Sequence, residues 1–432
     1  MPDKQQLIIF GDSPVRIHFF KNKIYCIFAG RNIINSRIKK VFFFLIALAS
    51  VFSCENVLYE GGPGPLAGDD LKGDGSWLGQ GGYHGGGHAG VLTAGEWNDL
   101  ERWGFWSQLM TGNRYGEMSD YWRFYTSRRV AVRVADAVGK RLPGVPVVLE
   151  KGQKAVWSTL TDNLGEASLW IDPFQAEAGT DDLAIIINGV RQSGAPKVTT
   201  WNEQQEEADV NFYQIGNAKA PEKKADIAFI VDATGSMGDE IAFLKKDLMN
   251  ILDRVKGGQG DIAFRTGTVF YRDKGDDYVT KYSRFTDNYH ETIQYIAMQS
   301  AQGGGDHPEA VHTALSVGLQ NLDWNASARS RIAFLILDAP AHQDQQGVIE
   351  SLQTSIENYA KYGIKIIPVF CSSPTKECEF MCRYFAILTG GTYVFLTDDS
   401  GVGAHHVISS VGEFQVEALN DLLVRLIAKY IG

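Results

Sequence analysis

The C-terminal half of this 432-residue chain alternates apolar runs with segments of helical periodicity. Apolar runs predict strands at 226–231, 261–270, 331–337, 364–370 and 391–395. Between and after them, helices are predicted at 237–255, 286–299, 308–322, 345–361, 376–389 and 414–430. This alternation is typical of an α/β doubly wound (Rossmann-like) fold with a mainly parallel sheet. Right-handed crossovers would place the carboxyl ends of the strands along one edge of that sheet.

The chain is acidic, with a formal net charge of -10, and no basic patch is visible in the sequence. Proteins that bind nucleic acid need a positively charged surface against the phosphate backbone. We therefore expect no nucleic-acid partner. The length allows two or three domains, each with its own core.

The N-terminal part carries a targeting pattern. Residues 41–52 are apolar and follow Lys39 and Lys40; as a helix they would rise about 18 Å, too little to cross a hydrocarbon core of about 30 Å. A basic flank and a short apolar region predict a secretory signal. The sequence Val51-Phe52-Ser53-Cys54 resembles a bacterial lipobox, which implies lipidation of Cys54. Residues 1–54 are then a signal and lipoprotein leader, in which the translation start has been placed too far upstream. The alternative is a plain signal peptide.

Residues 55–92 are dense in glycine, and such a segment costs too much backbone entropy to order by itself. We interpret it as a tether that holds the later domains away from a membrane. His84 and His88 within it could bind a metal ion adventitiously.

Residues 93–127 form a Trp-rich segment that we expect to be helical. Thr93 and Glu96 have the spacing of a capping box, which predicts a helix start. Trp97, Trp103 and Trp106 recur at near-helical steps and make one apolar face. Two interpretations stay open: packing against a neighbouring domain, or a platform on which carbohydrate rings stack.

Residues 128–217 change to a periodicity of two, with Val130, Val132 and Val134 alternating with other residues before a turn at 136–139. Short strands separated by Gly and Asp turns predict a β-sandwich. The run 130–167 resembles the transthyretin-like, carboxypeptidase-regulatory-like sandwiches. That resemblance implies a spacer or binding support without an active site.

Three segments with oxygen-bearing side chains should reach one edge of the C-terminal sheet. Asp232, Thr234 and Ser236 follow the apolar run 227–231, Asp306 and Glu309 lie in the glycine-rich segment 303–310, and Asp338 follows the run 334–337. Carboxylate and hydroxyl oxygens are ligands for Mg²⁺, with Ca²⁺ or Mn²⁺ as alternatives, rather than for zinc. Each Asp or Ser could instead cap the helix that follows it.

The pattern Asp-x-Thr-x-Ser with the two later loops resembles the metal-ion-dependent adhesion site (MIDAS) of von Willebrand factor type A (VWA) domains, over residues 224–432. The resemblance implies a divalent cation whose open position takes an Asp or Glu carboxylate of a protein partner. Many members present a Thr in the second loop, whereas Glu309 matches the integrin β-subunit version. That version also implies an adjacent second cation at Asp239 and Glu240. The implied ligands of the first cation are Asp232, Thr234, Ser236, Glu309 and Asp338.

The expected function is adhesion or protein interaction by a lipid-anchored protein of the bacterial cell envelope, at the outer membrane or cell surface, without enzymatic activity. The alternatives are a metal-dependent hydrolase, in which the cation activates water, and an assembly subunit with a structural metal.

Two features near the site each allow more than one interpretation. Asp273 borders the same rim and could orient metal-bound water or pair with Arg272. Cys371, Cys378 and Cys382 allow one disulfide and leave one thiol over.

Overall fold

The computed structural model describes residues 5–10, 13–20, 23–28, 92–112, 115–201, 207–216, 218–258, 261–305, 307–371, 375–397 and 409–432. The chain divides into two units, Met1–Ser76 and Trp77–Gly432. The first contains an antiparallel sheet of β1 (Gln5–Phe10), β2 (Ser13–Phe20) and β3 (Lys23–Phe28).

Several N-terminal predictions fall outside the described residues: the apolar segment 41–52, the lipidation site Cys54, and the tether with His84 and His88. They stay predictions. Within the part of the chain that is described, no helix is both long and apolar enough to cross a membrane.

The second unit is built on a mixed eight-stranded sheet in the order β15-β14-β13-β16-β17-β18-β4-β19. Its five central strands are parallel: β14 (Ala263–Tyr271), β13 (Glu222–Asp232), β16 (Ala328–Leu337), β17 (Ile364–Phe370) and β18 (Tyr393–Thr397). All five strands predicted from apolar runs are present. Antiparallel pairs add β15 (Thr280–Thr286), β4 (Thr93–Trp97) and β19 (Glu417–Ala418) at the edges.

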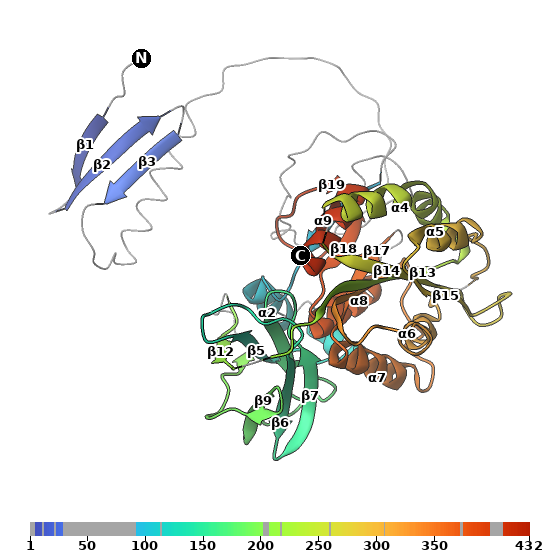
Figure 1. The fold of residues 1–432 in the computed structure, drawn as a ribbon, viewed down its shortest axis with the longest axis horizontal. Helices are drawn as coiled ribbons and strands as arrows, with labels where there is room; N and C mark the ends of the chain where they lie inside the picture. The colour runs from blue at the N-terminus through green and yellow to red at the C-terminus, as the bar shows by residue number, and fades with distance from the viewer. Residues whose placement is uncertain are drawn as a thin grey trace, which may run out of the picture. The chain divides into compact units, whose positions relative to one another are not determined.

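Helices cover both faces of this sheet (Figure 1). Side chains of β13 alternate between two cores: Ala228 and Ile230 face one, and Ile227, Phe229 and Val231 face the other. Apolar residues in continuous runs suit a strand that is buried on both sides. The helices of the first core are α6 (Val311–Gln320), α7 (Val348–Lys361) and α8 (Lys376–Thr389); those of the second are α4 (Gly238–Gly258), α5 (Tyr289–Ala297) and α9 (Leu419–Ile431).

The helix predicted to start at Thr93 is a wrong prediction, because residues 93–97 form strand β4. Thr397 Oγ1 donates a hydrogen bond to Thr93 Oγ1 (2.9 Å), and the backbone ladder runs on from this pair to Trp97 and Tyr393. The capping-box spacing is a local preference. Pairing with the unsatisfied edge of β18 supplies a full ladder of backbone hydrogen bonds, which outweighs it.

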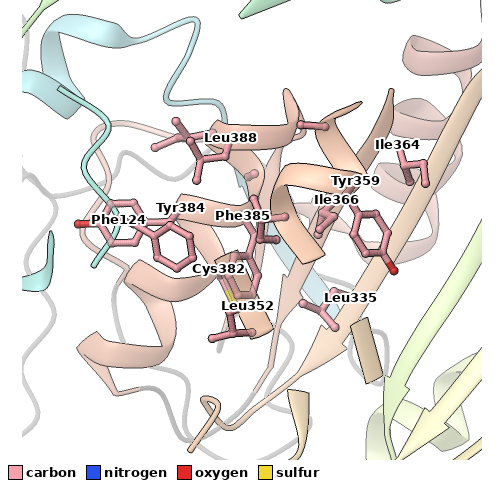
Figure 2. Close-up of a cluster of buried hydrophobic side chains, with 14 of the residues drawn as sticks. Phe124, Leu335, Leu352, Tyr359, Ile364, Ile366, Cys382, Tyr384, Phe385 and Leu388 are labelled. Carbon is pink, nitrogen blue, oxygen red and sulfur yellow. The ribbon is translucent and has the colours of Figure 1, made fainter. Parts of the chain in front are cut away.

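Helices α2 (Trp103–Thr111) and α3 (Glu117–Trp122) follow, and their tryptophans are buried. Trp103, Trp106 and Trp122 are fully inaccessible, so none of them can stack on a sugar, and the carbohydrate interpretation of these residues is wrong. The packing interpretation is confirmed. Phe124, just after α3, stacks on Tyr384 of α8 with centroids 5.7 Å apart (Figure 2).

Residues 128–216 form a β-rich region of two four-stranded sheets. One has the order β10-β9-β6-β7; in the other, β5 pairs with β8 and with β11 and β12. Val132, Leu149 and Ile185 face the buried side. The predicted sandwich architecture and its family resemblance stay predictions. The strands are β5 (Arg128–Ala135), β6 (Pro146–Lys151), β7 (Lys154–Leu160), β8 (Glu166–Trp170), β9 (Leu183–Ile187), β10 (Val190–Arg191), β11 (Thr199–Thr200) and β12 (Val210–Gln214).

Candidate functional site

Backbone hydrogen bonds join the three predicted loops at the carboxyl ends of β13 and β16. The first and second loops are linked by Gln302 N to Ala233 O (3.0 Å) and by Gly235 N to Gly303 O (3.1 Å). The second and third loops are linked by Glu309 N to Pro340 O (2.8 Å). The structure therefore brings together the segments that carry Asp232, Glu309 and Asp338.

Asp232 ends β13 and is fully buried. Its Oδ1 accepts hydrogen bonds from the backbone N (2.9 Å) and Oγ1 (2.7 Å) of Thr234. This is the local turn that an Asp before a helix favours, so capping accounts for one oxygen. Oδ2 makes no well-formed hydrogen bond among the described residues, although the buried Tyr271 hydroxyl is near enough to lower the pKa of Asp232, and capping does not account for this oxygen.

The hydroxyls lie beside the carboxylates. Thr234 Oγ1 is 3.4 Å from Ser236 Oγ, and a hydrogen bond from Ser236 offsets part of the rise in the Asp338 pKa that burial causes. Thr234 and Asp338 are buried, whereas Ser236 is exposed. The first-loop oxygens thus lie between buried carboxylates and the surface.

Glycine lets the second loop approach this group. A Cβ on Gly304 would lie 3.2 Å from Thr234 Cβ and 3.4 Å from Glu309 Oε1, and its φ is +75°. The backbone N of Gly304 donates to Asp276 Oδ2 (3.0 Å), an anchor that the sequence analysis did not identify. Glu309 is buried, and its Oε2 has no partner within the described part of the chain.

Burial and neighbouring carboxylates raise the pKa values of Asp232 and Glu309. Burial, followed by the charge of Asp338, raises the pKa of Asp232 to about 7. Burial, followed by the charge of Asp232, raises the pKa of Glu309 to about 9. Three neighbouring buried carboxyl groups are stable together only with protons or a cation to compensate their charge.

The donor types fit a hard cation: carboxylate and hydroxyl oxygens, with two carboxylate oxygens unpartnered. Among the described residues, however, no group of three or more His, Cys, Asp and Glu side chains has an arrangement that could hold a metal ion. The three predicted carboxylates, Asp232, Glu309 and Asp338, therefore do not make such a group by themselves. Cation binding therefore stays a prediction.

The other predicted site residues are placed separately. Asp239 and Glu240 lie in the first turn of α4, where Asp239 is exposed and Glu240 is buried near Cys371. A second cation there stays a prediction. Asp306 lies outside the described residues.

The predicted ion pair between Arg272 and Asp273 is wrong. Arg272 Nε donates to the carbonyl of Ala233 (3.1 Å) and Nη2 to that of Ser300 (2.9 Å), which fixes the first loop. Asp273 Oδ1 instead lies 2.9 Å from His342 Nε2 of the third loop. Adjacent residues that leave a strand point to opposite sides, which separates the two side chains.

The cysteines form no disulfide: Cys371, Cys378 and Cys382 are free and buried. Burial raises the pKa of Cys371 and Cys378 well above the usual thiol value. The disulfide that their number allowed is therefore not formed; Cys378 and Cys382 belong to the first core and Cys371 to the second.

Residues 226–374 match the family model of the von Willebrand factor A domain. The match covers all three loops and four of the six helices on the sheet, because α8 and α9 begin after it. The chain thus contains a VWA-type domain, accompanied by a β-rich region.

Two curated proteins resemble part of the chain. An ariadne-like RING finger protein of Acanthamoeba polyphaga mimivirus is 32% identical over 117 residues, which is 27% of this chain and 11% of that protein. The alpha-protein kinase vwkA of Dictyostelium discoideum is 27% identical over 142 residues, 32% of this chain and 22% of the kinase. The chain spans less than a quarter of either relative.

Among solved structures, the pilus adhesin SpaC from Lactobacillus rhamnosus GG in its open conformation has a TM-score of 0.34 and 13% identity, over 50% of this chain and 31% of that chain. Proximal thread matrix protein 1 from the mussel byssus has a TM-score of 0.28 and 12% identity, over 40% of this chain and 46% of that chain. At these scores neither likeness carries a functional conclusion.

Proposed function

We propose that this protein binds an acidic group of a protein partner through a divalent cation held by the VWA-type domain. The cation is Mg²⁺, with Ca²⁺ or Mn²⁺ as substitutes. The protein works in the cell envelope, anchored to a bacterial membrane through lipidated Cys54, as an adhesion or interaction protein without enzymatic activity. The ligands are Asp232, Thr234, Ser236, Glu309 and Asp338.

One observation carries the proposal: Asp232 Oδ2 and Glu309 Oε2 are buried without partners among the described residues. A buried polar atom without a hydrogen bond costs free energy, and a buried charge costs more. A hard divalent cation would satisfy both oxygens at once. A ligand set that includes two hydroxyls leaves the ion electron-poor, and an outside carboxylate is the group that it would attract.

The first test is Mg²⁺ and Mn²⁺ binding to the full chain by calorimetry. Asp232→Asn should remove saturable binding, because it removes charge from the central ligand. Asp261→Asn is the matched control, because that exposed carboxylate (side chain 86% accessible) precedes β14 at the opposite end of the sheet and lies outside the proposed ligand set. If the unaltered chain binds neither ion, the proposal is wrong.

The second test addresses the partner. Immobilised chain should retain a protein from envelope extract in Mg²⁺ and release it in EDTA, and Asp232→Asn should retain nothing. Capture that is unchanged by EDTA, together with a melting temperature that depends on metal, would favour a purely structural ion.

The Asp273–His342 contact favours one alternative, metal-dependent hydrolysis. The Asp273 carboxylate lies 2.9 Å from an imidazole on the third loop, and an imidazole can act as a general base. Hydrolysis of an ester or phosphate panel that disappears in both Asp232→Asn and His342→Asn would establish this activity. No turnover is expected if the site only binds.

A further inference from the structure

The connection between β14 and β15, residues 272–279, contacts all three loops of the proposed cation site. Arg272 Nε donates a hydrogen bond to the carbonyl of Ala233 in the first loop (3.1 Å). Asp273 Oδ1 lies 2.9 Å from His342 Nε2 in the third loop. The second loop is contacted by a further carboxylate of the same connection. None of these residues belongs to the proposed ligand set, so the connection borders the site without supplying one of its ligands.

The second loop depends on such a contact because residues 303–305 are three consecutive glycines. Glycine has no side chain with which to hold its own position, and it loses the most conformational freedom when it is ordered. Hydrogen bonds of the main chain must therefore order this stretch. Gly303 O accepts one from Gly235 N of the first loop (3.1 Å). Gly304 N donates to both carboxylate oxygens of Asp276, at 3.2 Å to Oδ1 and 3.0 Å to Oδ2.

Asp276 is itself held in a tight turn. Its backbone N donates to Asp273 O (3.4 Å), and its Oδ2 accepts a hydrogen bond from Asp273 N (3.2 Å). The same carboxylate lies against the glycine backbone, because a Cβ on Gly303, whose φ is +78°, would collide with it. The Asp276 side chain therefore occupies the space that a side chain on the second loop would need.

Gly304 is the point at which this anchor reaches the proposed ligands. An added Cβ there would lie 3.2 Å from Thr234 Cβ and 3.4 Å from Glu309 Oε1, so the Gly304 backbone packs against a hydroxyl residue and a carboxylate residue of the ligand set. Loss of the bond from Gly304 to Asp276 would let the backbone beside these two ligands move.

We propose that Asp276 is a positioning residue of the cation site: its carboxylate accepts the Gly304 hydrogen bonds that hold the second loop beside Thr234 and Glu309. This inference rests on the proposed function, because it concerns the affinity of the same site. A carboxylate could instead act through its charge, by attracting the cation or by binding it. Both oxygens of Asp276 already accept backbone hydrogen bonds, which favours the role of an acceptor.

Two substitutions separate these roles. Asp276→Ala removes the charge and both acceptor atoms, whereas Asp276→Asn removes the charge and keeps one acceptor oxygen. In the full chain, Asp276→Ala should weaken Mn²⁺ binding, measured by calorimetry, by about tenfold or more, since hydrogen bonds to a charged group are lost. Asp276→Asn should recover most of that affinity. Asp261→Ala is the control, because this exposed carboxylate lies at the other end of β14, and it should leave the affinity unchanged.

A second measurement needs no metal. Hydrogen exchange of the Gly304 amide in EDTA reports the anchor itself, because an amide exchanges when its hydrogen bond opens. Asp276→Ala should accelerate this exchange by about tenfold or more, whereas Asp276→Asn and Asp261→Ala should leave it slow. If the unaltered chain binds no Mn²⁺, the proposed function is wrong, and accelerated exchange in Asp276→Ala would still assign the anchoring of the second loop to Asp276.

Weakened binding and accelerated exchange in Asp276→Ala, both reversed in Asp276→Asn, support the positioning role. Equal loss of Mn²⁺ affinity in the two variants would mean that Asp276 acts through its charge or as a ligand. Unchanged exchange or unchanged affinity in Asp276→Ala would mean that other bonds hold the second loop. Each of these results overturns the proposal. If Asp276→Ala does not fold, Asp276→Asn decides, since retained Mn²⁺ affinity supports the acceptor role and lost affinity overturns it.

Discussion

Arg383 and Asp99 form a fully buried ion pair that fastens the Trp-rich segment to α8. Arg383 Nη2 lies 2.6 Å from Asp99 Oδ1, and Nε lies 3.0 Å from Oδ2. Neither side chain is more than 2% accessible. The pair joins residues far apart in the sequence, and Glu379 and the carbonyl of Ser410 complete the surroundings of the arginine.

Removing one partner should destabilise the protein strongly. Asp99→Ala leaves the Arg383 charge buried and is expected to cost about 3–5 kcal/mol of unfolding free energy. The control is Glu350→Ala, which breaks an ion pair with Arg123 whose side chains are about 60% exposed; its cost should stay below about 1 kcal/mol. Urea denaturation measures both, and equal costs would contradict a structural role for the buried pair.

Trp106→Ala should also destabilise the protein, by about 3–5 kcal/mol, because it leaves a cavity in a fully buried position. It also leaves Thr126 without the indole Nε1 donor that lies 3.0 Å from its hydroxyl. Thermal and urea unfolding report the loss. A fully stable variant would show that the Trp-rich segment does not belong to the core.

Gly304→Ala tests the approach of the second loop to the first. Alanine at φ +75°, with its Cβ 3.2 Å from Thr234, should cost about 1 kcal/mol or more and weaken Mn²⁺ binding. Gly275→Ala is the control: its φ is +103°, but no atom lies within 4 Å of the added Cβ. Gly275→Ala should lower the free energy of unfolding through backbone strain without loss of Mn²⁺ affinity. Equal affinity in both variants would contradict a role for Gly304 in assembling the site.

Stability in EDTA should fall as pH rises. Unfolded Asp and Glu ionise near pH 4, whereas the folded chain keeps protons on Asp232 and Glu309 up to about pH 7 and about pH 9. Groups whose folded pKa is raised stabilise the protein below the unfolded pKa, and this stability is lost as pH increases through the folded pKa. Melting temperatures between pH 4 and 9 should decrease in EDTA and recover in part with Mg²⁺.

Asp232→Asn should reduce that pH dependence, because one of the two titrating carboxyl groups is removed. It should also abolish the effect of Mg²⁺ on the melting temperature. A slope unchanged from that of the unaltered chain would show that Asp232 does not take part in the titration.

Local patterns in the sequence were sufficient for the five parallel strands and the helices of the VWA-type domain. Continuous apolar runs identify strands buried on both faces, and residues 227–231 of β13 have that character. Asp232, Thr234 and Ser236 could also be found, because neighbours in one loop stay close whatever the rest of the chain does. Placing Glu309 and Asp338 beside them needed the topology of a parallel sheet.

Only the tertiary structure determined which residues distant in sequence became partners. Residues 93–97 carry a helix-start pattern but become β4, because the edge of β18 offers backbone hydrogen bonds. Asp273 meets His342 rather than its neighbour Arg272. Sequence periodicity indicates which side of a helix or strand is buried. It does not indicate which distant group pairs with a given hydrogen-bonding or charged group. The tertiary fold determines these partners, because the buried polar groups must all be satisfied in the same structure.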